Sequence, residues 1–208
     1  MTGIRPGKVV CVGRNYLAHA REMGNEVPPE PLLFLKPPSA VIGSGEPIVL
    51  PRVSRQVEHE AEIAVVVGRR LRRATEREAA AAIGGVTCAN DVTARDFQRR
   101  DGQWTRAKGF DTFCPLGPRV VEHIDWRGLE VIGRVNGAER QRGRAADMHF
   151  SIPFLLAHIS GIMTLQAGDL VLTGTPAGVG PLQAGDVVEV EIPGVGVLSN
   201  PVVNEDAA

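Results

Sequence analysis

The sequence has 208 residues, of which 43% are hydrophobic and 23% are charged, and its formal net charge is −1. This composition predicts an ordinary globular protein, which we expect to form one domain over residues 1–208. The near-neutral charge gives no electrostatic reason to bind nucleic acid or a membrane, so the expected partner is a small molecule or a second copy of the chain. Three widely spaced cysteines predict reduced thiols and a cytoplasmic protein.

Short apolar runs and turns alternate in the N-terminal part of the chain. The run Val9–Val12 predicts a first strand, and residues 15–23 predict a helix that ends before Gly24. Residues 25–38 are predicted to form a loop that could include a short strand at Leu32–Leu35. The β-branched run Ile63–Val67 predicts a further strand.

The clearest predicted helix begins after Thr75. Thr75 can cap the helix, and Glu78 three residues later completes a capping box. The alanine-rich run then continues to Ile83 and is expected to end at the glycine pair 84–85. A strand at Val86–Ala89 should follow.

The C-terminal part of the chain is predicted to be mostly strand and turn. The run Glu130–Val135 should enter a tight Asn-Gly turn, and Ser151–Ile162 should form a helix with proline in its first turn. Strands are expected at Leu170–Leu172 and Val187–Ile192. The predicted fold is therefore α+β and strand-rich, a mixed β-sheet roll or sandwich with peripheral helices.

Two glutamates, Glu60 and Glu62, directly precede the apolar strand run, and Asp91 follows the strand after it. The two-residue period of a strand puts both glutamates on one face, where they repel each other unless one is protonated or a cation lies between them. A third carboxylate favours the cation. Oxygen ligands without thiolates select Mg²⁺ or Mn²⁺, whereas Ca²⁺ usually takes more protein oxygens. The alternative is a solvated strand face.

Three further segments carry residues suited to chemistry. His19 and Glu22 lie three residues apart on a predicted helix, so the carboxylate can orient the imidazole as a general base, although such pairs are also common on helix surfaces. Lys108 could bind an oxyanion or be an ordinary loop residue. The glycine-rich segment 173–180 can offer N–H groups to an anion but lacks the lysine of a phosphate loop.

Taken together, these segments resemble the fumarylacetoacetate hydrolase family, in its short single-domain form. That form includes acylpyruvases, oxaloacetate decarboxylases and bacterial hydroxy-dienedioate isomerases. The resemblance extends from about residue 10 to about residue 201. It rests on ordered motifs at Gly13–Met23, Phe34–Pro37, His59–Glu62, Asn90–Gln98, Lys108–Phe113, Val135–Gly137 and Leu172–Gly180.

The resemblance implies a role for nine positions of this sequence. It implies that Glu60, Glu62 and Asp91 bind Mg²⁺ or Mn²⁺, that His19 and Glu22 activate water, and that Lys108 stabilises developing negative charge. It further implies that three residues support the metal site or hold the substrate's carboxylate: Arg95, Gln98 and Thr175. A homodimer is also implied. Lys36 lies in a family motif but receives no catalytic step, and Glu58 is interpreted as a solvated or supporting residue.

The implied substrate is a small 2-oxo acid. The metal would act as a Lewis acid while the neighbouring C–C bond breaks, in acylpyruvate hydrolysis or oxaloacetate decarboxylation through a metal-bound pyruvate enolate. The alternative is an isomerase or decarboxylase of unsaturated 2-hydroxy diacids in aromatic catabolism. A non-enzymatic scaffold on the same fold is a third reading. Substrate specificity is expected to depend on segments 24–31 and 98–104.

Overall fold

Two sheets form most of the structure, a computed structural model that describes residues 5–207 apart from residues 23, 25 and 27. The larger sheet has seven strands in the order β2-β1-β12-β6-β7-β9-β3. Their bounds in this order are Leu32–Lys36, Val9–Gly13, Leu170–Leu172, Ala61–Val67, Ile83–Asn90, Cys114–Val121 and Val41–Ile42. Strand β1 pairs parallel with β12 and antiparallel with β2, so the sheet is mixed as predicted.

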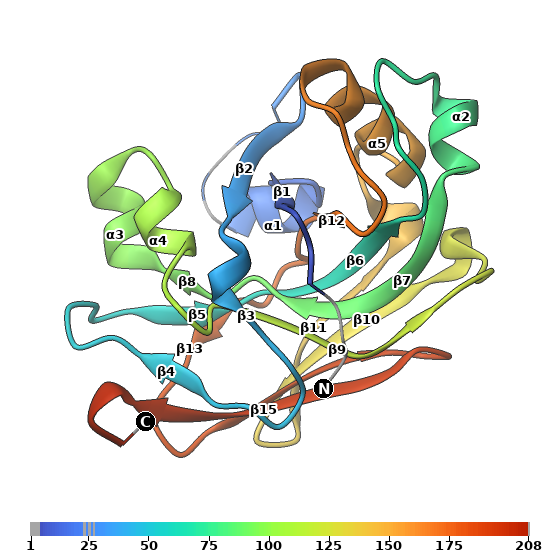
Figure 1. Cartoon of the computed structure of the whole chain (residues 1–208). Coiled ribbons are helices and arrows are strands. Elements are labelled where there is room, and N and C mark those ends of the chain that lie inside the picture. The colour runs from blue at the N-terminus through green and yellow to red at the C-terminus, as the bar shows by residue number, and fades with distance from the viewer. Residues whose placement is uncertain (1–4, 23, 25, 27, 208) are drawn as a thin grey trace.

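The second sheet has five strands in the order β11-β10-β14-β15-β4. These strands are Ala138–Arg144, Glu130–Val135, Val187–Ile192, Gly196–Asn204 and Ile48–Leu50. A small three-stranded sheet, β13-β5-β8, joins Gly180–Pro181, Val57–His59 and Thr93–Ala94. The larger sheet curls over the five-stranded one (Figure 1), which gives the predicted strand-rich roll.

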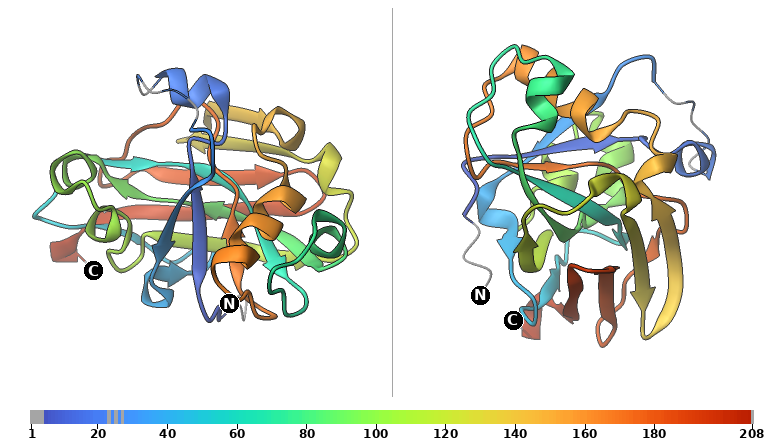
Figure 2. Two further views of the ribbon diagram at one scale, coloured as in Figure 1. Left: turned by 90° about the horizontal axis from the view of Figure 1, so that it is seen from above. Right: turned by 90° about the vertical axis from the view of Figure 1, so that its right-hand side faces the viewer.

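The helices lie outside the sheets (Figure 1). The α-helices are α1 Leu17–Glu22, α2 Glu76–Ala80, α3 Arg95–Asp101, α4 Thr105–Lys108 and α5 Ile152–Ile162, and short 3₁₀ turns occur at Pro38–Ala40, Trp126–Gly128, Ala145–Asp147 and Glu205–Ala207. Helices α2 and α5 pack together at one end and α3 and α4 at the other, while α1 lies at the periphery in both views of Figure 2. Within the described residues, no helix has the length and apolar character needed to cross a bilayer.

Alternation along β6 divides its side chains between two buried clusters. Ile63, Val65 and Val67 belong to the larger cluster with α5 and the five-stranded sheet, whereas Ala64 belongs to a smaller cluster of residues from β1, β12 and β7. Glu62 shares the parity of Ala64 and therefore points to the same face of the sheet as this smaller cluster. All three cysteines are free and buried, as expected for reduced thiols.

The predicted helix after Thr75 begins as expected but ends early. Thr75 and Glu78 form the capping box, yet α2 stops at Ala80 and β7 already starts at Ile83. The predicted end at the glycine pair was therefore wrong. These glycines lie inside β7 because the strands approach closely there: a Cβ on Gly84 would lie 2.6 Å from the Cα of Gly68.

The first helix is shorter than predicted. It covers Leu17–Glu22, and residue 23 of the predicted span lies outside the described residues. Asn15 does not join the helix because its side chain binds backbone groups elsewhere: Nδ2 donates to Thr173 O at 2.8 Å and to Phe150 O at 3.1 Å, and Oδ1 accepts from Phe150 N at 2.8 Å. These bonds fix the segment between β1 and α1 against the end of β12.

Candidate active site

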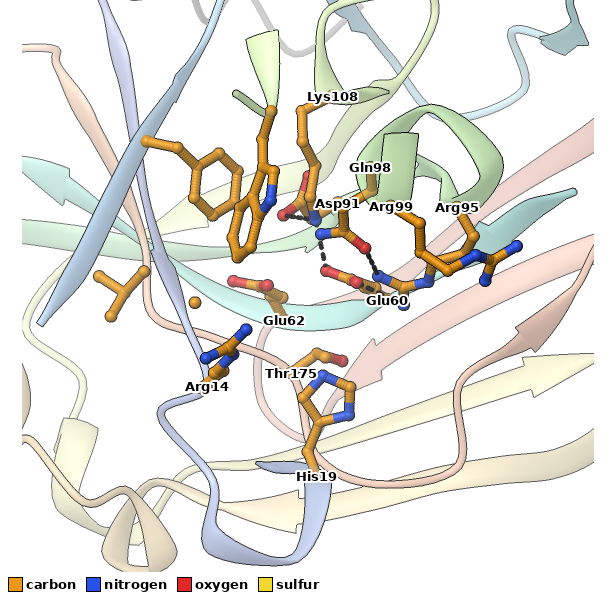
Figure 3. Close-up of a pocket in the computed structure, with 14 residues that line it drawn as sticks. Arg14, His19, Glu60, Glu62, Asp91, Arg95, Gln98, Arg99, Lys108 and Thr175 are labelled. Atoms are coloured by element: carbon orange, nitrogen blue, oxygen red, sulfur yellow. Dashed lines mark hydrogen bonds and ion pairs between the residues drawn. The ribbon is translucent and has the colours of Figure 1, made fainter. Parts of the chain in front are cut away.

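Backbone pairing between β6 and β7 brings three carboxylates together. Ala61 pairs with Asn90, and the N–H of Asp91 donates to Glu60 O at 2.9 Å, so Asp91 lies beside the start of β6. One carboxylate oxygen from each of Glu60, Glu62 and Asp91 lies within 4.8 Å of the others (Figure 3). All three side chains are buried. The two glutamates thus lie close together as predicted, although Glu60 lies between β5 and β6 and only Glu62 lies within a strand.

Two buried lysines compensate this acidic cluster. Lys108 Nζ lies 2.8 Å from Glu60 Oε2 and 2.7 Å from Asp91 Oδ2. Lys36 Nζ donates to the other oxygen of Asp91 at 2.6 Å and to Val92 O at 3.1 Å, and its side chain is fully buried. Asp91 is therefore held from both sides, and Lys36 has a positioning contact that the sequence did not assign to it.

The guanidinium of Arg95, at the start of α3, contacts three side chains of the protein. Its Nε donates to Glu58 Oε2 at 2.7 Å and its Nη1 to Gln98 Oε1 at 2.9 Å. Its Nη2 lies 2.6 Å from Glu60 Oε1, as an ion pair without an aligned hydrogen bond. Glu58 is therefore a buried partner of Arg95 and not a solvated residue. The amide oxygen of Gln98 is also occupied, which leaves its NH₂ group to face the cavity.

The pKa values of the two glutamates move in opposite directions. Burial alone would raise the pKa of Glu60, but Lys108 and Arg95 hold it well below its usual range. The pKa of Glu62 is raised, by burial first and then by the charges of Asp91 and Glu60. The backbone N–H of Gly174, 2.7 Å from Glu62 Oε2, offsets only part of this. Because the ionised form of Glu62 is unfavourable in this setting, a cation in the cluster would stabilise it. The three oxygen donors suit Mg²⁺ or Mn²⁺.

His19 and Glu22 both lie on α1, and Figure 3 shows the imidazole of His19 across the cavity from the acidic cluster. His19 Nδ1 is 3.2 Å from Glu22 Oε2, and the imidazole is buried. Both oxygens of Glu22 accept from the N–H of Gly178, at 3.0 and 3.1 Å. Only glycine fits at position 178, because its φ is +99° and a Cβ would lie 1.9 Å from Arg140 O. The glycine-rich segment thus anchors Glu22.

Thr175 is held by a network that sequence reasoning missed. Its hydroxyl donates to Ala61 O at 2.9 Å and accepts from Gln141 Nε2 at 2.7 Å. Gln141 Oε1 also accepts from Ala61 N at 2.9 Å and lies 2.9 Å from His59 Nδ1. Because the hydroxyl proton is already donated, Thr175 serves in this arrangement to fix the loop beside the cavity. No pattern around Gln141 in the sequence indicates this contact.

The predicted site residues line one cavity of about 290 Å³, except for Glu22, which reaches it only through His19. The cavity is also lined by side chains without a predicted role, which are Val12, Arg14, Phe34, Arg99 and Trp104. Arg99 and Trp104 come from segment 98–104, where specificity was expected. The rings of Phe34 and Trp104 pack edge to face at 5.2 Å and form an apolar wall. Segment 24–31 includes residues outside the described part of the chain.

The chain belongs to the fumarylacetoacetate hydrolase family. The family model described as fumarylacetoacetate (FAA) hydrolase C-terminal matches residues 8–203. The chain is 45% identical over 194 residues to the mitochondrial oxaloacetate tautomerase FAHD1 of Arabidopsis thaliana, covering 90% of this chain and 87% of that protein. These matches confirm the predicted resemblance and fold.

Two solved structures show the same fold. A 5-carboxymethyl-2-hydroxymuconate delta-isomerase from Mycobacterium smegmatis superposes with a TM-score of 0.92 at 49% identity, covering 98% of this chain and 81% of that one. A fumarylpyruvate hydrolase from Pseudomonas aeruginosa, in complex with Mn²⁺ and pyruvate, superposes with a TM-score of 0.91 at 33% identity, covering 96% and 91%. The family therefore includes proteins named for tautomerisation, isomerisation and hydrolysis.

Proposed function

We propose that this protein is a divalent-metal-dependent enzyme that acts on small 2-oxo acids at the carbon next to the keto group. One observation carries the proposal: a buried cluster of three carboxylates and a histidine paired with a glutamate line the same small cavity. The Mn²⁺ and pyruvate bound to the fumarylpyruvate hydrolase support the same class of ligand here. Mg²⁺ and Mn²⁺ both suit the three oxygen donors.

The residues divide the chemistry between them. A Mg²⁺ or Mn²⁺ ion held by Glu60, Glu62 and Asp91 would supply a Lewis acid for the keto and carboxylate oxygens of the substrate. His19, oriented by Glu22, takes a proton from a water or from carbon 3 of the substrate. Lys108 uses two N–H groups on Glu60 and Asp91, so its third can donate to the oxygen on which negative charge develops.

Cleavage of a C–C bond is the first candidate reaction. With an acylpyruvate, His19 deprotonates a water that attacks the distal carbonyl, and the bond to carbon 3 breaks to give a carboxylic acid and the enolate of pyruvate. With oxaloacetate, loss of CO₂ gives the same enolate without an attacking water. Protonation of carbon 3 then yields pyruvate in both cases.

Tautomerisation is a second candidate, which the relative named oxaloacetate tautomerase favours at 45% identity. In this reaction His19 removes a proton from carbon 3 and a proton is returned to the enol oxygen, so that no C–C bond breaks. The same cavity residues serve both reactions, because each passes through negative charge on the keto oxygen.

The test is a parallel assay of the full-length protein with acetylpyruvate and oxaloacetate, each with Mg²⁺, with Mn²⁺ and with EDTA. Pyruvate release reports C–C cleavage, and the ultraviolet absorbance of the enol of oxaloacetate reports tautomerisation. Metal-dependent turnover in either assay supports the proposal, and the assay that detects it identifies the reaction. Turnover that continues in EDTA, or no turnover in either assay, would contradict the proposed function.

A further inference from the structure

Arg14 is a cation of the cavity wall whose charge no side chain of the described residues pairs. Arg95 and Lys108 are engaged with carboxylates, and Arg99 Nη2 donates to Gln56 Oε1 at 2.6 Å. Within the described residues, Arg14 makes neither an ion pair nor a side-chain hydrogen bond, although it is half-buried and lines the cavity. In Figure 3 its guanidinium points into the cavity beside Glu62, on the same side as His19 and Thr175.

The backbone at Arg14 is held in an unusual conformation. Its φ is +59°, in the left-handed region that residues other than glycine and asparagine rarely adopt. The next residue, Asn15, fixes this turn through its three hydrogen bonds to Phe150 and Thr173. A non-glycine residue in a strained turn that its neighbour enforces is typical of a functional position. The turn directs the Arg14 side chain towards the cavity instead of continuing β1.

The charges of the cavity wall favour a dianionic ligand. Three carboxylates of the acidic cluster face four cations of the lining, of which Arg14 is one, and the opposite charges of Glu58 and Lys36 behind them cancel. A divalent ion in the cluster would add two further positive charges, so the wall would then carry an excess of three. A 2-oxo acid that chelates the ion with its keto and carboxylate oxygens brings one negative charge. A second carboxylate at the far end of the ligand would offset more of the excess.

We infer that Arg14 binds the distal carboxylate of a dicarboxylic 2-oxo acid and thereby determines the substrate class. This inference rests on the proposed function, because it takes the metal-chelating end of the substrate to lie at Glu60, Glu62 and Asp91. Arg14 and His19 lie on the same side of the cluster, so a ligand stretched towards Arg14 presents its carbon 3 to the imidazole. Arg99, on the opposite side, is exposed and already bonded to Gln56.

The test compares two non-reacting ligands that differ only in the distal group. Calorimetry with the Mn²⁺-loaded full chain measures the Kd of 2-oxoglutarate and of 2-oxopentanoate, which has a methyl group in place of the distal carboxylate. The wild type should prefer 2-oxoglutarate. Arg14→Gly and Arg14→Met should weaken 2-oxoglutarate binding by roughly 10- to 100-fold, the range for a charged hydrogen bond, and leave 2-oxopentanoate within about 3-fold. Arg127→Met, on the exposed 126–128 turn, is the control.

The glycine variant separates this role from a structural one. Glycine favours the φ of position 14, so Arg14→Gly should fold at least as stably as the wild type. An equal loss for both ligands, or an altered Mn²⁺ affinity, would assign Arg14 to the metal site and overturn the inference. So would a selective loss in Arg99→Met alone. Because binding needs no turnover, a wild type that prefers 2-oxoglutarate but is inactive on acetylpyruvate and oxaloacetate would refute the proposed function and leave the role of Arg14 supported.

Discussion

The two sides of the cavity differ in how far the protein has already paired their charges. On the side of β6 and β7, Glu60 and Asp91 are held by Lys36, Lys108 and Arg95 at 2.6 to 2.8 Å. On the side of β1 and α1, Arg14 has no partner among the described residues, and His19 has only Glu22. The fold therefore pairs Glu60 and Asp91 with cations on the first side and leaves Glu62 without one, whereas the second side keeps its polar groups for a ligand.

This difference indicates that the acidic cluster is maintained for function. Burying several charges costs more desolvation than well-packed apolar residues would, even when the charges are paired. This cost is clearest at Glu62, because its raised pKa means that its charged form is unfavourable in the metal-free fold. A bound cation would offset this desolvation cost, because it would stabilise the charged forms of all three carboxylates.

The largest effect is expected from breaking the assembled side. Lys36→Met removes the buried ammonium from Asp91 Oδ1 and leaves that oxygen uncompensated. Loss of one partner of a buried pair should lower the free energy of unfolding by about 3–5 kcal/mol, measured by urea denaturation. Arg142→Met, which breaks ion pairs of this exposed arginine with Glu130 and Glu139, should have a much smaller effect. Equal losses in the two variants would refute the importance of burial here.

Removing the imidazole tests the reactive side. His19→Ala should reduce kcat by at least ~100-fold, the scale of a general base, with Mn²⁺ affinity unchanged. His123→Ala, at an exposed position that does not line the cavity, should retain full turnover. Steady-state kinetics on whichever substrate the wild type accepts provides the measurement. Undiminished turnover in His19→Ala would remove the histidine from the mechanism.

The opposite pKa shifts predict opposite effects of neutralising two neighbouring glutamates. Because the fold raises the pKa of Glu62, this group costs stability as the pH rises above its ordinary value of 4.5. Glu60 has a lowered pKa, so its stabilisation is full above pH 4.5 and is lost as the pH falls below it. In EDTA at pH 7, Glu62→Gln should therefore raise Tm by a few degrees, and Glu60→Gln should lower it. Thermal melts from pH 4 to 8 would reveal the signs, and a lower Tm for Glu62→Gln would contradict the account.

The smallest effect is expected far from the cavity. Thr75→Ala removes the hydroxyl that accepts from Glu78 N and caps α2. The expected loss is about 1 kcal/mol in the free energy of unfolding, as for other N-caps. Turnover should not change, because α2 packs against α5 at the end of the molecule away from α3 and α4. A loss of turnover in this variant would mean that the cavity depends on distant stability.

Local signals in the sequence were sufficient for much of the fold. Runs of apolar, mostly β-branched residues predicted β1, β6 and β14, and the proline in its first turn helped to predict α5. Helices α3 and α4 were missed because Ala94 and Trp104 provide no side-chain cap and α4 is only four residues long. The end of α2 was misplaced because the role of Gly84 depends on contact with Gly68 across the sheet.

The residues of the candidate site also divide into those that local sequence patterns predicted and those that only contacts distant in sequence bring together. Glu60 and Glu62 could be paired from the strand period, and His19 and Glu22 from helix spacing, because both patterns are local. Lys36, in contrast, meets Asp91 across 55 positions of sequence, so its burial could not be foreseen from its neighbours. The same holds for Gln141 and Thr175. The cavity location of the predicted residues agrees with their proposed roles, and those roles and the homodimer stay predictions.

The most direct test of the central claim is a calorimetric Mn²⁺ titration of the wild type, Glu62→Gln and His19→Ala. The account predicts one Mn²⁺ per wild-type chain, unchanged affinity in His19→Ala, and affinity weakened by more than about 10-fold in Glu62→Gln, since a ligand is lost. Failure of the wild type to bind Mn²⁺, or equal weakening in both variants, would contradict the division of the cavity into a metal side and a reactive side.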